Sequence, residues 1–483
     1  MNKKQKTVTM IISPTRLCDR KCVYCYVKGR TNEHSIDKSI MKLSLIKTIF
    51  EQANDLFPNV RVLWHGGEPS NAGADFYEKA VSYQKNVEVN SVQTNGFCDK
   101  EVLRTWQNLK FNVGTSMDIP LTVNQKTRRE TPYKAQKRIA LLNQYNDDHV
   151  GVISMVTRYN VHKPWEMVKM TKKYRVKFNP VFFNNNFAPT PEEYTTFLKW
   201  WVDKSLKEPS FGAVEPIREF VQHVLFGKSN SCSFLENCQE SFLAIDQLGD
   251  IYPCNRFMGM KKYKLGSVQE SIAKSVNSPI KKYFKKRASL LISNECKDCL
   301  WLNQCYGGCP SESGIWRKDP FCSTYQNIRD YIQKLFIAYG VKFEENNSVV
   351  SMPINIFTSL PGLRRFISMI NRQPFSRDCG YESQNFYNDS YLYEHDDYDD
   401  YDDYDDYNDY SDHSDHSDHS DYHYYDDENK YLDCVETINI KAQLLPQFIK
   451  GNKIVFKKMK IQNISTLSYC EYSEHSDSHS DYS

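Results

Sequence analysis

Cysteine carries the strongest chemical signal in this chain of 483 residues, which contains fifteen of them. Three stand close together as Cys18-x3-Cys22-x2-Cys25. In a reducing compartment, clustered cysteines are more often metal ligands than disulfide partners. Three thiolates hold three iron corners of a 4Fe–4S cluster and leave the fourth iron open. This spacing therefore predicts a cluster that binds a ligand rather than one that only passes electrons.

Three glycine-containing motifs follow, each at the end of a predicted strand. They are Gly-Gly-Glu-Pro at 66–69, Gln-Thr-Asn-Gly at 93–96 and Gly-Thr-Ser-Met-Asp at 114–118. Glycine lets a backbone approach a ligand closely. The basic pair Arg128-Arg129 comes shortly afterwards and supplies a cation for an acidic group. Each motif alone is typical of an ordinary turn, but their common placement indicates one site.

Eight further cysteines follow beyond residue 226. Their spacing is Cys232-x5-Cys238, then Gly249-x4-Cys254, then Cys296-x2-Cys299-x5-Cys305-x3-Cys309, then Cys322. Eight thiols suffice for two fully Cys-ligated 4Fe–4S clusters. A structural zinc site stays open as an alternative, because Cys296-x2-Cys299 alone suits zinc. We assign no role to the four remaining cysteines, which are Cys98, Cys379, Cys434 and Cys470.

The elements that must position these residues alternate between strand and helix. Strands are predicted at 8–13, 59–64, 87–93, 111–117, 149–157 and 175–183, and helices at 38–54, 74–84, 99–109, 134–146 and 164–173. This alternation is typical of a parallel sheet, open or closed into a barrel. Barrel enzymes place their sites at the carboxyl ends of the strands, which is where the three glycine-containing motifs fall. Helices are also predicted at 191–226 and 323–338.

Together, the first cysteine set and these motifs resemble the radical S-adenosylmethionine (SAM) enzymes. The resemblance implies an α/β fold with a partial (β/α)6 barrel in residues 1–225. It implies that the open iron chelates SAM, which one electron cleaves to methionine and a 5′-deoxyadenosyl radical. The SAM site would consist of Tyr24, Gly66, Gly67, Glu68, Ser116 and Arg128. For the SAM carboxylate, Arg129 is the alternative to Arg128.

The second cysteine set resembles the SPASM extension of peptide-modifying radical SAM enzymes. Its Cys232 matches the arrangement in the anaerobic sulfatase-maturating enzymes of that group. The resemblance implies a Cys-rich domain at 226–340, with little periodic structure and two auxiliary clusters. One cluster would be held by Cys232, Cys238, Cys254 and Cys309, and the other by Cys296, Cys299, Cys305 and Cys322. The expected cofactors are thus three 4Fe–4S clusters and SAM.

One position departs from the sulfatase-maturating pattern. In those enzymes an Asp directly follows the Cys of the Gly-x4-Cys element and serves as catalytic base, whereas this chain has Asn255. An amide does not take up a proton at neutral pH. Oxidation of a sulfatase Cys or Ser to formylglycine is therefore kept as an alternative function. Asp118 and Asp246 are the candidates for a substitute base.

Charge is distributed unevenly along the chain. Residues 381–433 hold 20 Asp and Glu against one Lys, which leaves +21 on the rest of a chain whose net charge is +2. From His395 to Asp421 the chain runs through nine triplets, each with Tyr or His first and Asp third. Such a segment is too charged and too poor in aliphatic residues to build a core. We expect a poorly ordered linker at 341–390 with a helix at 355–371, the acidic triplet repeat at 391–433, and a C-terminal tail at 434–483; the low-complexity tail is expected to be disordered.

The triplets resemble the acceptors of the three-residue cyclophane synthases, radical SAM–SPASM enzymes that join a ring carbon of residue i to the Cβ of residue i+2. In an extended chain these two side chains point to the same side, about 6.6 Å apart. The repeat is thus a candidate substrate carried by the same chain. A solvated acidic tail and a metal-binding tail are the alternatives.

We therefore expect a radical SAM oxidoreductase that modifies peptides, either its own tail or a companion precursor, with flavodoxin or ferredoxin as electron donor. An iron–sulfur electron carrier or metal-binding protein is the non-enzyme alternative, which the open-iron triad disfavours. No apolar run approaches the roughly 18 residues of a membrane span. The basic start of the chain leads into too short an apolar run for a secretory signal. We expect a cytoplasmic protein with neither membrane nor nucleic acid as partner.

Overall fold

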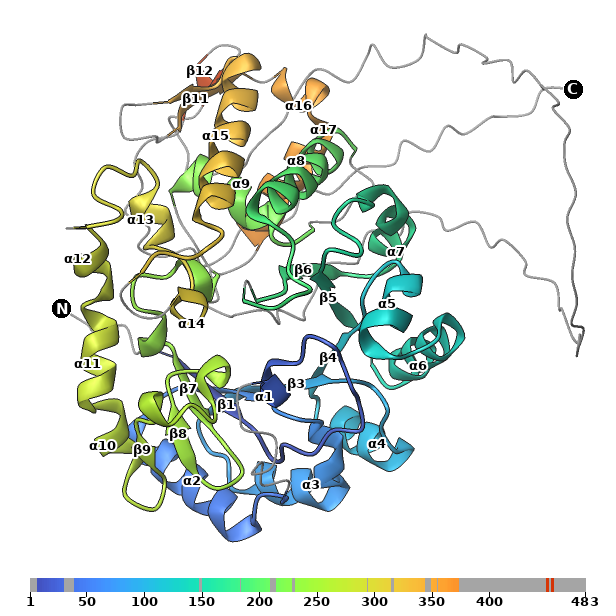
Figure 1. Ribbon diagram of the computed structural model, residues 1–483, viewed down its shortest axis with the longest axis vertical. Coiled ribbons are helices and arrows are strands. Elements are labelled where there is room, and N and C mark those ends of the chain that lie inside the picture. Colours follow the sequence, from blue (N-terminus) through green and yellow to red (C-terminus); the bar gives the residue numbers. More distant parts are fainter. Residues whose placement is uncertain are drawn as a thin grey trace, which may run out of the picture. The chain divides into compact units, whose positions relative to one another are not determined.

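The computed structural model describes residues 7–29, 39–146, 150–182, 184–208, 214–227, 231–292, 294–313, 317–343, 349–353, 355–372, 449–450 and 453–455 (Figure 1). The acidic triplet repeat and the cysteines Cys379, Cys434 and Cys470 lie outside these residues, so the predictions for them stay predictions. In the part of the chain that is described, no helix is both long and apolar enough to cross a bilayer.

A parallel sheet forms the centre of the fold. Its strands include β1 (Val8–Ile12), β2 (Val60–Trp64), β3 (Val87–Thr94), β4 (Asn112–Ser116), β5 (Gly151–Val156) and β6 (Val176–Pro180). Each pairs in parallel with the next in chain order. The predicted α/β alternation is confirmed, and the carboxyl ends of these strands lie along one edge of the sheet.

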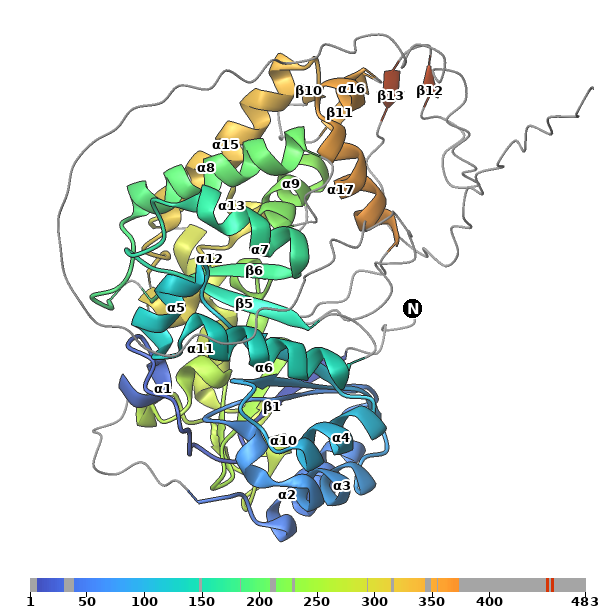
Figure 2. The ribbon, with the colours of Figure 1, turned by 90° about the vertical axis from the view of Figure 1, so that its right-hand side faces the viewer.

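Helices cover the outer face of this sheet, one after each strand (Figures 1 and 2). They are α2 (Leu43–Leu56), α3 (Ala74–Ser82), α4 (Lys100–Asn108), α6 (Pro132–Gln144) and α7 (Val168–Lys173), with the additional short helices α1 (Tyr26–Gly29) and α5 (Leu121–Arg128). Each long helix buries one apolar stripe, as α2 does with Ile46, Ile49 and Phe50. Trp64 of β2 is fully buried beneath them and packs against Tyr77 of α3, with ring centroids 5.3 Å apart.

The sheet continues into the Cys-rich region. Strand β7 (Phe242–Ile245) pairs in parallel with β1, and β8 (Asp250–Tyr252) and β9 (Gly266–Ser267) follow antiparallel. Within the described residues β6 and β9 are the two edges, so the barrel is partial, as predicted. The boundary predicted at 225/226 is crossed by this one sheet, and the prediction of little regular structure is wrong for β7 to β9. Hydrogen bonding to β1 supplies order that the short apolar runs alone did not indicate.

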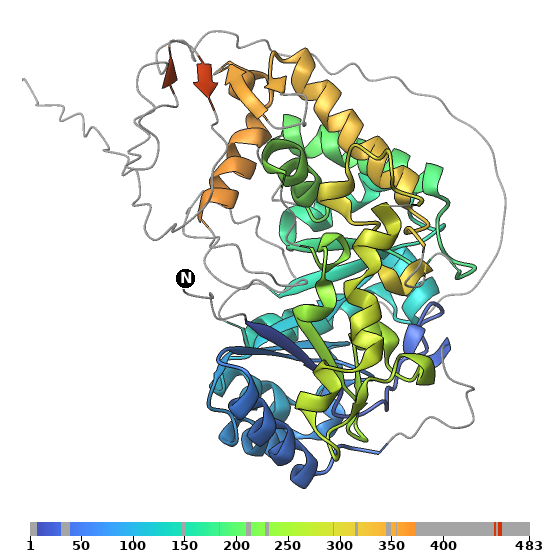
Figure 3. The same ribbon diagram turned by 90° about the vertical axis from the view of Figure 1, so that its left-hand side faces the viewer.

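Short helices complete the Cys-rich region. Helices α10 (Ile272–Val276), α11 (Pro279–Lys285) and α12 (Arg287–Ile292) run one after another, with α10 beside β9; they are yellow-green in Figure 3. The shortest pieces are α13 (Leu302–Cys305) and α14 (Pro310–Ser313), and the 3-10 turns at Pro69–Ala72, Pro164–Met167, Cys232–Phe234, Cys238–Glu240, Asn255–Phe257 and Lys261–Tyr263. Most cysteines of the second set lie in or next to these pieces.

A layer of longer helices lies beyond β6 (Figure 2). Helices α8 (Pro191–Lys207), α9 (Ile217–Phe226), α15 (Cys322–Ala338) and α17 (Pro361–Arg372) pack against one another. Helix α8 begins with a capping box, in which the Thr190 hydroxyl accepts from the Glu193 N–H and the Glu193 carboxylate accepts from the Thr190 N–H. The helices predicted at 191–226, 323–338 and 355–371 are confirmed.

The prediction of a poorly ordered linker is wrong for residues 342–343, 349–353 and 355–372, which are the described part of this region. This stretch forms β10 (Lys342–Phe343), β11 (Val349–Pro353), α16 (Ile356–Ser359) and α17, and its Met352, Leu363 and Phe366 are buried in the same core as Trp201. Two strands that follow the triplet repeat, β12 (Ile449–Lys450) and β13 (Lys453–Val455), complete a small antiparallel sheet with β11. Long-range pairing and packing order these segments, which their local sequence does not predict.

Candidate functional site

The three cysteines of the first set lie beyond the carboxyl end of β1. Cys18, Cys22 and Cys25 stand in the loop between β1 and α1, and all three are half-buried. Burial raises the pKa of the Cys18 thiol to about 11. Such a thiol stays protonated at neutral pH unless a metal displaces the proton. Two side chains donate toward the loop: Asn95 Nδ2 lies 3.8 Å from Cys18 Sγ, and Arg128 Nη1 lies 3.9 Å from Cys22 Sγ.

The Gly-Gly-Glu-Pro turn after β2 packs directly on this loop. Gly66 has a φ of +137°, and a Cβ there would lie 1.9 Å from Ser13 Oγ. A Cβ on Gly67 would lie 2.3 Å from the Leu17 carbonyl oxygen. Side chains are excluded at both positions because the turn runs against the segment that leads into the first cysteine set. The turn therefore holds its backbone close to that set.

Glu68 of the same turn ties two motifs together. Its buried carboxylate accepts hydrogen bonds from the Ser70 N–H at 3.1 Å, the Thr94 hydroxyl at 2.7 Å and the Asn95 N–H at 2.6 Å. Burial raises the pKa of Glu68, and these hydrogen bonds oppose that rise. The Glu68 carboxylate thus joins the end of β2 to the end of β3 through hydrogen bonds to Ser70, Thr94 and Asn95.

Asp118 lies at the end of β4 and is fully buried. Its carboxylate accepts from the Tyr24 hydroxyl, from the Thr127 hydroxyl at 2.6 Å and from the Met155 N–H at 2.9 Å. It also pairs with Arg128, whose Nε lies 3.4 Å from Oδ1. A catalytic base needs a path to the substrate proton. The contacts of Asp118 instead make it the group that positions Tyr24 and Arg128.

The structure separates the two candidate arginines. The guanidinium of Arg128 is turned inward over the Tyr24 ring, 5.5 Å from its centroid, whereas Arg129 is exposed at the end of α5. Ser116 lies nearby and its hydroxyl accepts from Gln93 Nε2 at 2.8 Å. Among the described residues, Gln93 Oε1 is buried without a hydrogen-bond partner. A buried acceptor of this kind fits a ligand that carries N–H or O–H donors.

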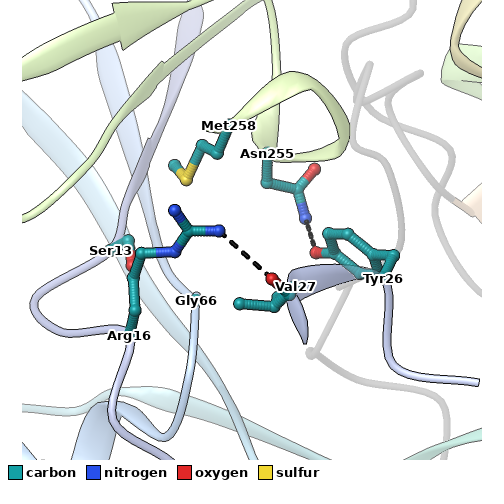
Figure 4. A pocket seen from close by; sticks show the side chains of 7 residues that line it. All are labelled: Ser13, Arg16, Tyr26, Val27, Gly66, Asn255 and Met258. Carbon is teal, nitrogen blue, oxygen red and sulfur yellow. Dashed lines mark hydrogen bonds between the residues drawn. The ribbon is translucent and has the colours of Figure 1, made fainter. Parts of the chain in front are cut away.

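A pocket opens between this edge of the sheet and the Cys-rich region (Figure 4). It is lined by Ser13, Arg16, Tyr26, Val27, Gly66, Asn255 and Met258. Asn255 Nδ2 donates to the Tyr26 hydroxyl at 2.9 Å, and Arg16 Nη2 donates to the Val27 carbonyl oxygen at 3.2 Å. The position at which sulfatase-maturating enzymes carry their base therefore faces the same space as the glycine turn.

Four cysteines of the second set are brought together near β7 and β8. Burial raises the pKa of Cys238 well above its usual range, and Cys232, Cys254 and Cys309 raise it further by charge repulsion. Burial also raises the pKa of Cys254 to about 12. Arg256 lies beside the group, with Nη1 3.7 Å from Cys309 Sγ. Buried thiols with a cation beside them fit the thiolate ligands of an anionic cluster.

The other four cysteines gather at the start of α15. Burial raises the pKa of Cys322 to about 11, and repulsion from Cys305, Cys296 and Cys299 adds to the effect. Gln326 Nε2 donates to Cys299 Sγ at 3.2 Å. The cysteines therefore lie in the two groups of four that the resemblance implied. Their roles as ligands are taken up below as a proposal.

Within the described ranges, no three His, Cys, Asp or Glu side chains are placed to hold a common metal ion.

Sequence reasoning missed several residues that line or support the site. Arg16 and Tyr26 each lie within two residues of a predicted cluster ligand, and Arg256 lies two residues after Cys254. Their position next to these cysteines is the sequence feature from which they could have been predicted. Cys98 is half-buried, and its Sγ lies 3.5 Å from the Thr94 hydroxyl. Burial raises the pKa of Cys98 to about 12, which suits a structural thiol.

The family model of the radical SAM superfamily matches residues 12–171, from the end of β1 into α7. This range contains the first cysteine set and all three glycine-containing motifs. The chain thus contains a radical SAM domain, and such a domain implies a 4Fe–4S cluster and SAM as cofactors. The Cys-rich region that follows is consistent with a SPASM extension.

Individual proteins give the same result. The chain is 27% identical over 360 residues to a cysteine-type anaerobic sulfatase-maturating enzyme of Clostridium perfringens (strain ATCC 13124). This match covers 67% of this chain and 96% of the relative. The solved structure of native anSMEcpe with bound AdoMet is 24% identical, with a TM-score of 0.59 over 68% of this chain and 98% of that chain. Streptococcus suis SuiB bound to S-adenosylmethionine is 17% identical, with a TM-score of 0.50 over 66% and 77% of the two chains. At these identities the structures establish the likeness of fold, which confirms the predicted fold class.

Proposed function

We propose that this radical SAM enzyme is a peptide maturase that joins an aromatic ring to the Cβ of an Asp two residues later. Its substrate would be the triplet repeat at 395–421 or a companion peptide with the same pattern. The observation that carries the proposal is that nine such triplets occur in the same chain as the site. The related proteins named as sulfatase-maturating enzymes support an action on polypeptide side chains.

We infer the residues that would hold the cofactors from the motifs and from the contacts described above. Cys18, Cys22 and Cys25 would ligate the first cluster, and the two groups of four cysteines the auxiliary clusters. The backbone of the turn at 66–69, with Tyr24, Ser116 and Arg128, would hold SAM, and Glu68 would hold that turn in place. When bound, the clusters and SAM supply a 5′-deoxyadenosyl radical and an acceptor for one electron, with flavodoxin or ferredoxin as external reductant.

The bond change is balanced for each triplet. One C–H bond at the Asp Cβ and one C–H bond on the ring are replaced by one C–C bond. One hydrogen atom leaves with 5′-deoxyadenosine, and the second leaves as a proton and an electron. In an extended triplet the ring and the Asp side chain lie on the same side, about 6.6 Å apart, so a small local adjustment brings them together.

A second candidate function is formylglycine formation. The alignment that covers 96% of a cysteine-type sulfatase-maturating enzyme favours it. The pocket disfavours it, because Asn255 stands where those enzymes have their Asp base, and Asp118 is fully buried and does not line the pocket. Asn255→Ala should then retain SAM cleavage, and a Cys-x-Pro-x-Arg test peptide should gain no formylglycine. Robust conversion of that peptide would favour the second function.

Mass spectrometry after anaerobic incubation with SAM and reductant tests the crosslinking proposal. Each modified triplet should lose about 2 Da, the mass of two hydrogens. Fragmentation should be suppressed within Tyr398–Asp400 or His413–Asp415 but not between triplets. Tyr398→Leu should abolish the mass change at its own triplet only. An unmodified tail beside a modified companion peptide would reject self-modification, and no modified peptide of either kind would reject the crosslinking proposal.

A further inference from the structure

The pocket that contains Asn255 also contains the Arg16 guanidinium, which pairs with no carboxylate among the described residues. Figure 4 shows the Arg16 guanidinium reaching between Gly66, Met258 and Asn255. Its Nη2 donates to the Val27 carbonyl oxygen at 3.2 Å. In the described part of the chain, Arg16 forms no ion pair, and its Nε and Nη1 have no hydrogen-bond partner. Those two donors are available to an anion that enters the pocket.

Asp246 interacts electrostatically with Arg16 but forms no ion pair with it in the described structure. Arg16 acts on the pKa of Asp246, yet burial is the main influence and raises that pKa to about 6. Asp246 Oδ1 is engaged in the turn between β7 and β8, where it accepts from the Leu248 and Asp250 N–H groups at 3.0 Å each. This carboxylate therefore belongs to the turn, and Asp246 does not line the pocket.

Asn255 supplies a further hydrogen-bond donor to the same pocket. Its amide donates one N–H to the Tyr26 hydroxyl at 2.9 Å, and an amide nitrogen carries a second N–H. An Asp at this position would place a negative charge beside Arg16 and would repel a second carboxylate. The neutral amide removes that repulsion and adds a donor, so the pocket is suited to an incoming carboxylate.

We propose that Arg16 and Asn255 bind the side-chain carboxylate of the substrate residue that is modified, and so select peptides with Asp at that place. This inference rests on the proposed function and names its substrate specificity. Charge-assisted hydrogen bonds from a guanidinium and an amide fix both the identity and the orientation of a carboxylate. The Asp Cβ is one bond from that carboxylate, so holding the carboxylate beside Gly66 also places the Cβ next to the site where SAM is expected.

The peptide and SAM each carry a carboxylate, so either molecule could supply the anion for this pocket. The SAM carboxylate has its own candidate in Arg128, which lies in α5 near the end of β4 and is not among the residues that line this pocket. These two possibilities predict different effects of substituting Arg16 on the binding of peptide and of SAM. Loss of Arg16 should weaken binding of an Asp peptide and leave SAM binding intact.

Peptide binding tests the proposal in the cluster-loaded, SAM-bound full-length protein. To remove competition from its own repeat, the third-position Asp of each triplet from Asp397 to Asp421, together with Asp477 and Asp481, is replaced by Asn. The probe is a fluorescent peptide with the sequence His413–Asp421 (HSDHSDHSD). One control peptide, HDSHDSHDS, keeps composition and charge but moves Asp next to the ring. Another, HSNHSNHSN, replaces Asp by its amide.

The first peptide should bind about tenfold or more tightly than either control, the size expected for one charge-assisted hydrogen bond. Arg16→Gln should erase this preference. Asn255→Asp should weaken binding of the Asp peptide about tenfold and leave the Asn peptide unaffected. Lys262→Gln removes an exposed positive charge outside the pocket and should change none of these ratios.

Equal binding of the first peptide and HDSHDSHDS would overturn the proposal. So would an Arg16→Gln variant that loses SAM affinity while keeping the peptide preference, because the carboxylate would then be that of SAM. The expected preference without any 2 Da mass loss would support the pocket assignment and reject crosslinking. The failure of one proposal is thereby distinguished from the failure of the other.

Discussion

At the scale of single residues, Asp118 shows how burial decides a role. The sequence offers it as a base, but its carboxylate is fully buried and engaged by Tyr24, Thr127, Met155 and Arg128. Because this carboxylate holds an arginine and a tyrosine in place, we expect Asp118 to act as a positioning residue through them.

Asp118→Asn should raise the dissociation constant of SAM about tenfold, because Arg128 loses a charged partner worth about 1.5–3 kcal/mol. A SAM titration of the cluster-loaded protein measures this. Arg129→Gln is the control and should leave SAM affinity unchanged, since Arg129 is exposed. If Asp118 were the base instead, the Asn variant would bind SAM normally and form no product.

At the scale of elements, the contact between the turn at 66–69 and the loop after β1 holds two motifs together. Gly67→Ala should displace the loop, because the new Cβ would lie 2.3 Å from a carbonyl oxygen. Anaerobic reconstitution should then give about eight irons per chain instead of about twelve, since only the first cluster is lost. Gly151→Ala is the control, as a Cβ there meets nothing within 4 Å. Full iron content in the Gly67 variant would contradict this reading of the contact.

Helices α9 and α15 are joined by a buried polar chain. His223 Nε2 lies 3.0 Å from Glu219 Oε1, and Arg329 Nε donates to His223 Nδ1 at 3.0 Å. Burial, aided by the charge of Arg329, lowers the pKa of His223 to about 4. The imidazole is therefore neutral at pH 7, with Nδ1 accepting and Nε2 donating.

This lowered pKa makes stability depend on pH. The unfolded chain binds a proton with a pKa of about 6.5 and the folded chain does not, so stability is lost as the pH falls below that value. At pH 5.5 the loss amounts to about 1.4 kcal/mol. When the pH is lowered from 7.5 to 5.5, the thermal midpoint of unfolding should drop further in the wild type than in the His223→Gln variant. His162→Gln, at an exposed histidine, should behave as the wild type.

At the scale of the whole molecule, the proposed ligation of one 4Fe–4S cluster by each of the three cysteine groups predicts the iron content. Reconstituted protein should contain about twelve irons, and a Cys18/Cys22/Cys25→Ala triple variant should retain about two thirds of them and lose all SAM cleavage. Iron analysis and the electron paramagnetic resonance of the reduced protein measure this. A zinc-containing, iron-poor protein after anaerobic purification would contradict the cluster assignment.

The sequence alone predicted the parallel α/β alternation and the Cys18-x3-Cys22-x2-Cys25 set, and its resemblance to SPASM enzymes implied the two further groups of cysteines. The alternation and the first cysteine set are local features, because strand and helix periods and short ligand spacings are written in short stretches of chain. The radical SAM domain and the partial barrel followed from them and are confirmed. The departure at Asn255 was also visible in the sequence, since it needed only the residue next to Cys254.

Only the tertiary structure decided what depends on distant contacts. It joined β7 to β1 across a predicted domain boundary, buried Met352, Leu363 and Phe366 in the same core as Trp201, and turned Arg128 inward while leaving Arg129 exposed. It also placed Arg16 and Asn255, 239 positions apart, in one pocket. Burial and pairing between remote segments set these outcomes, and no local pattern encodes them.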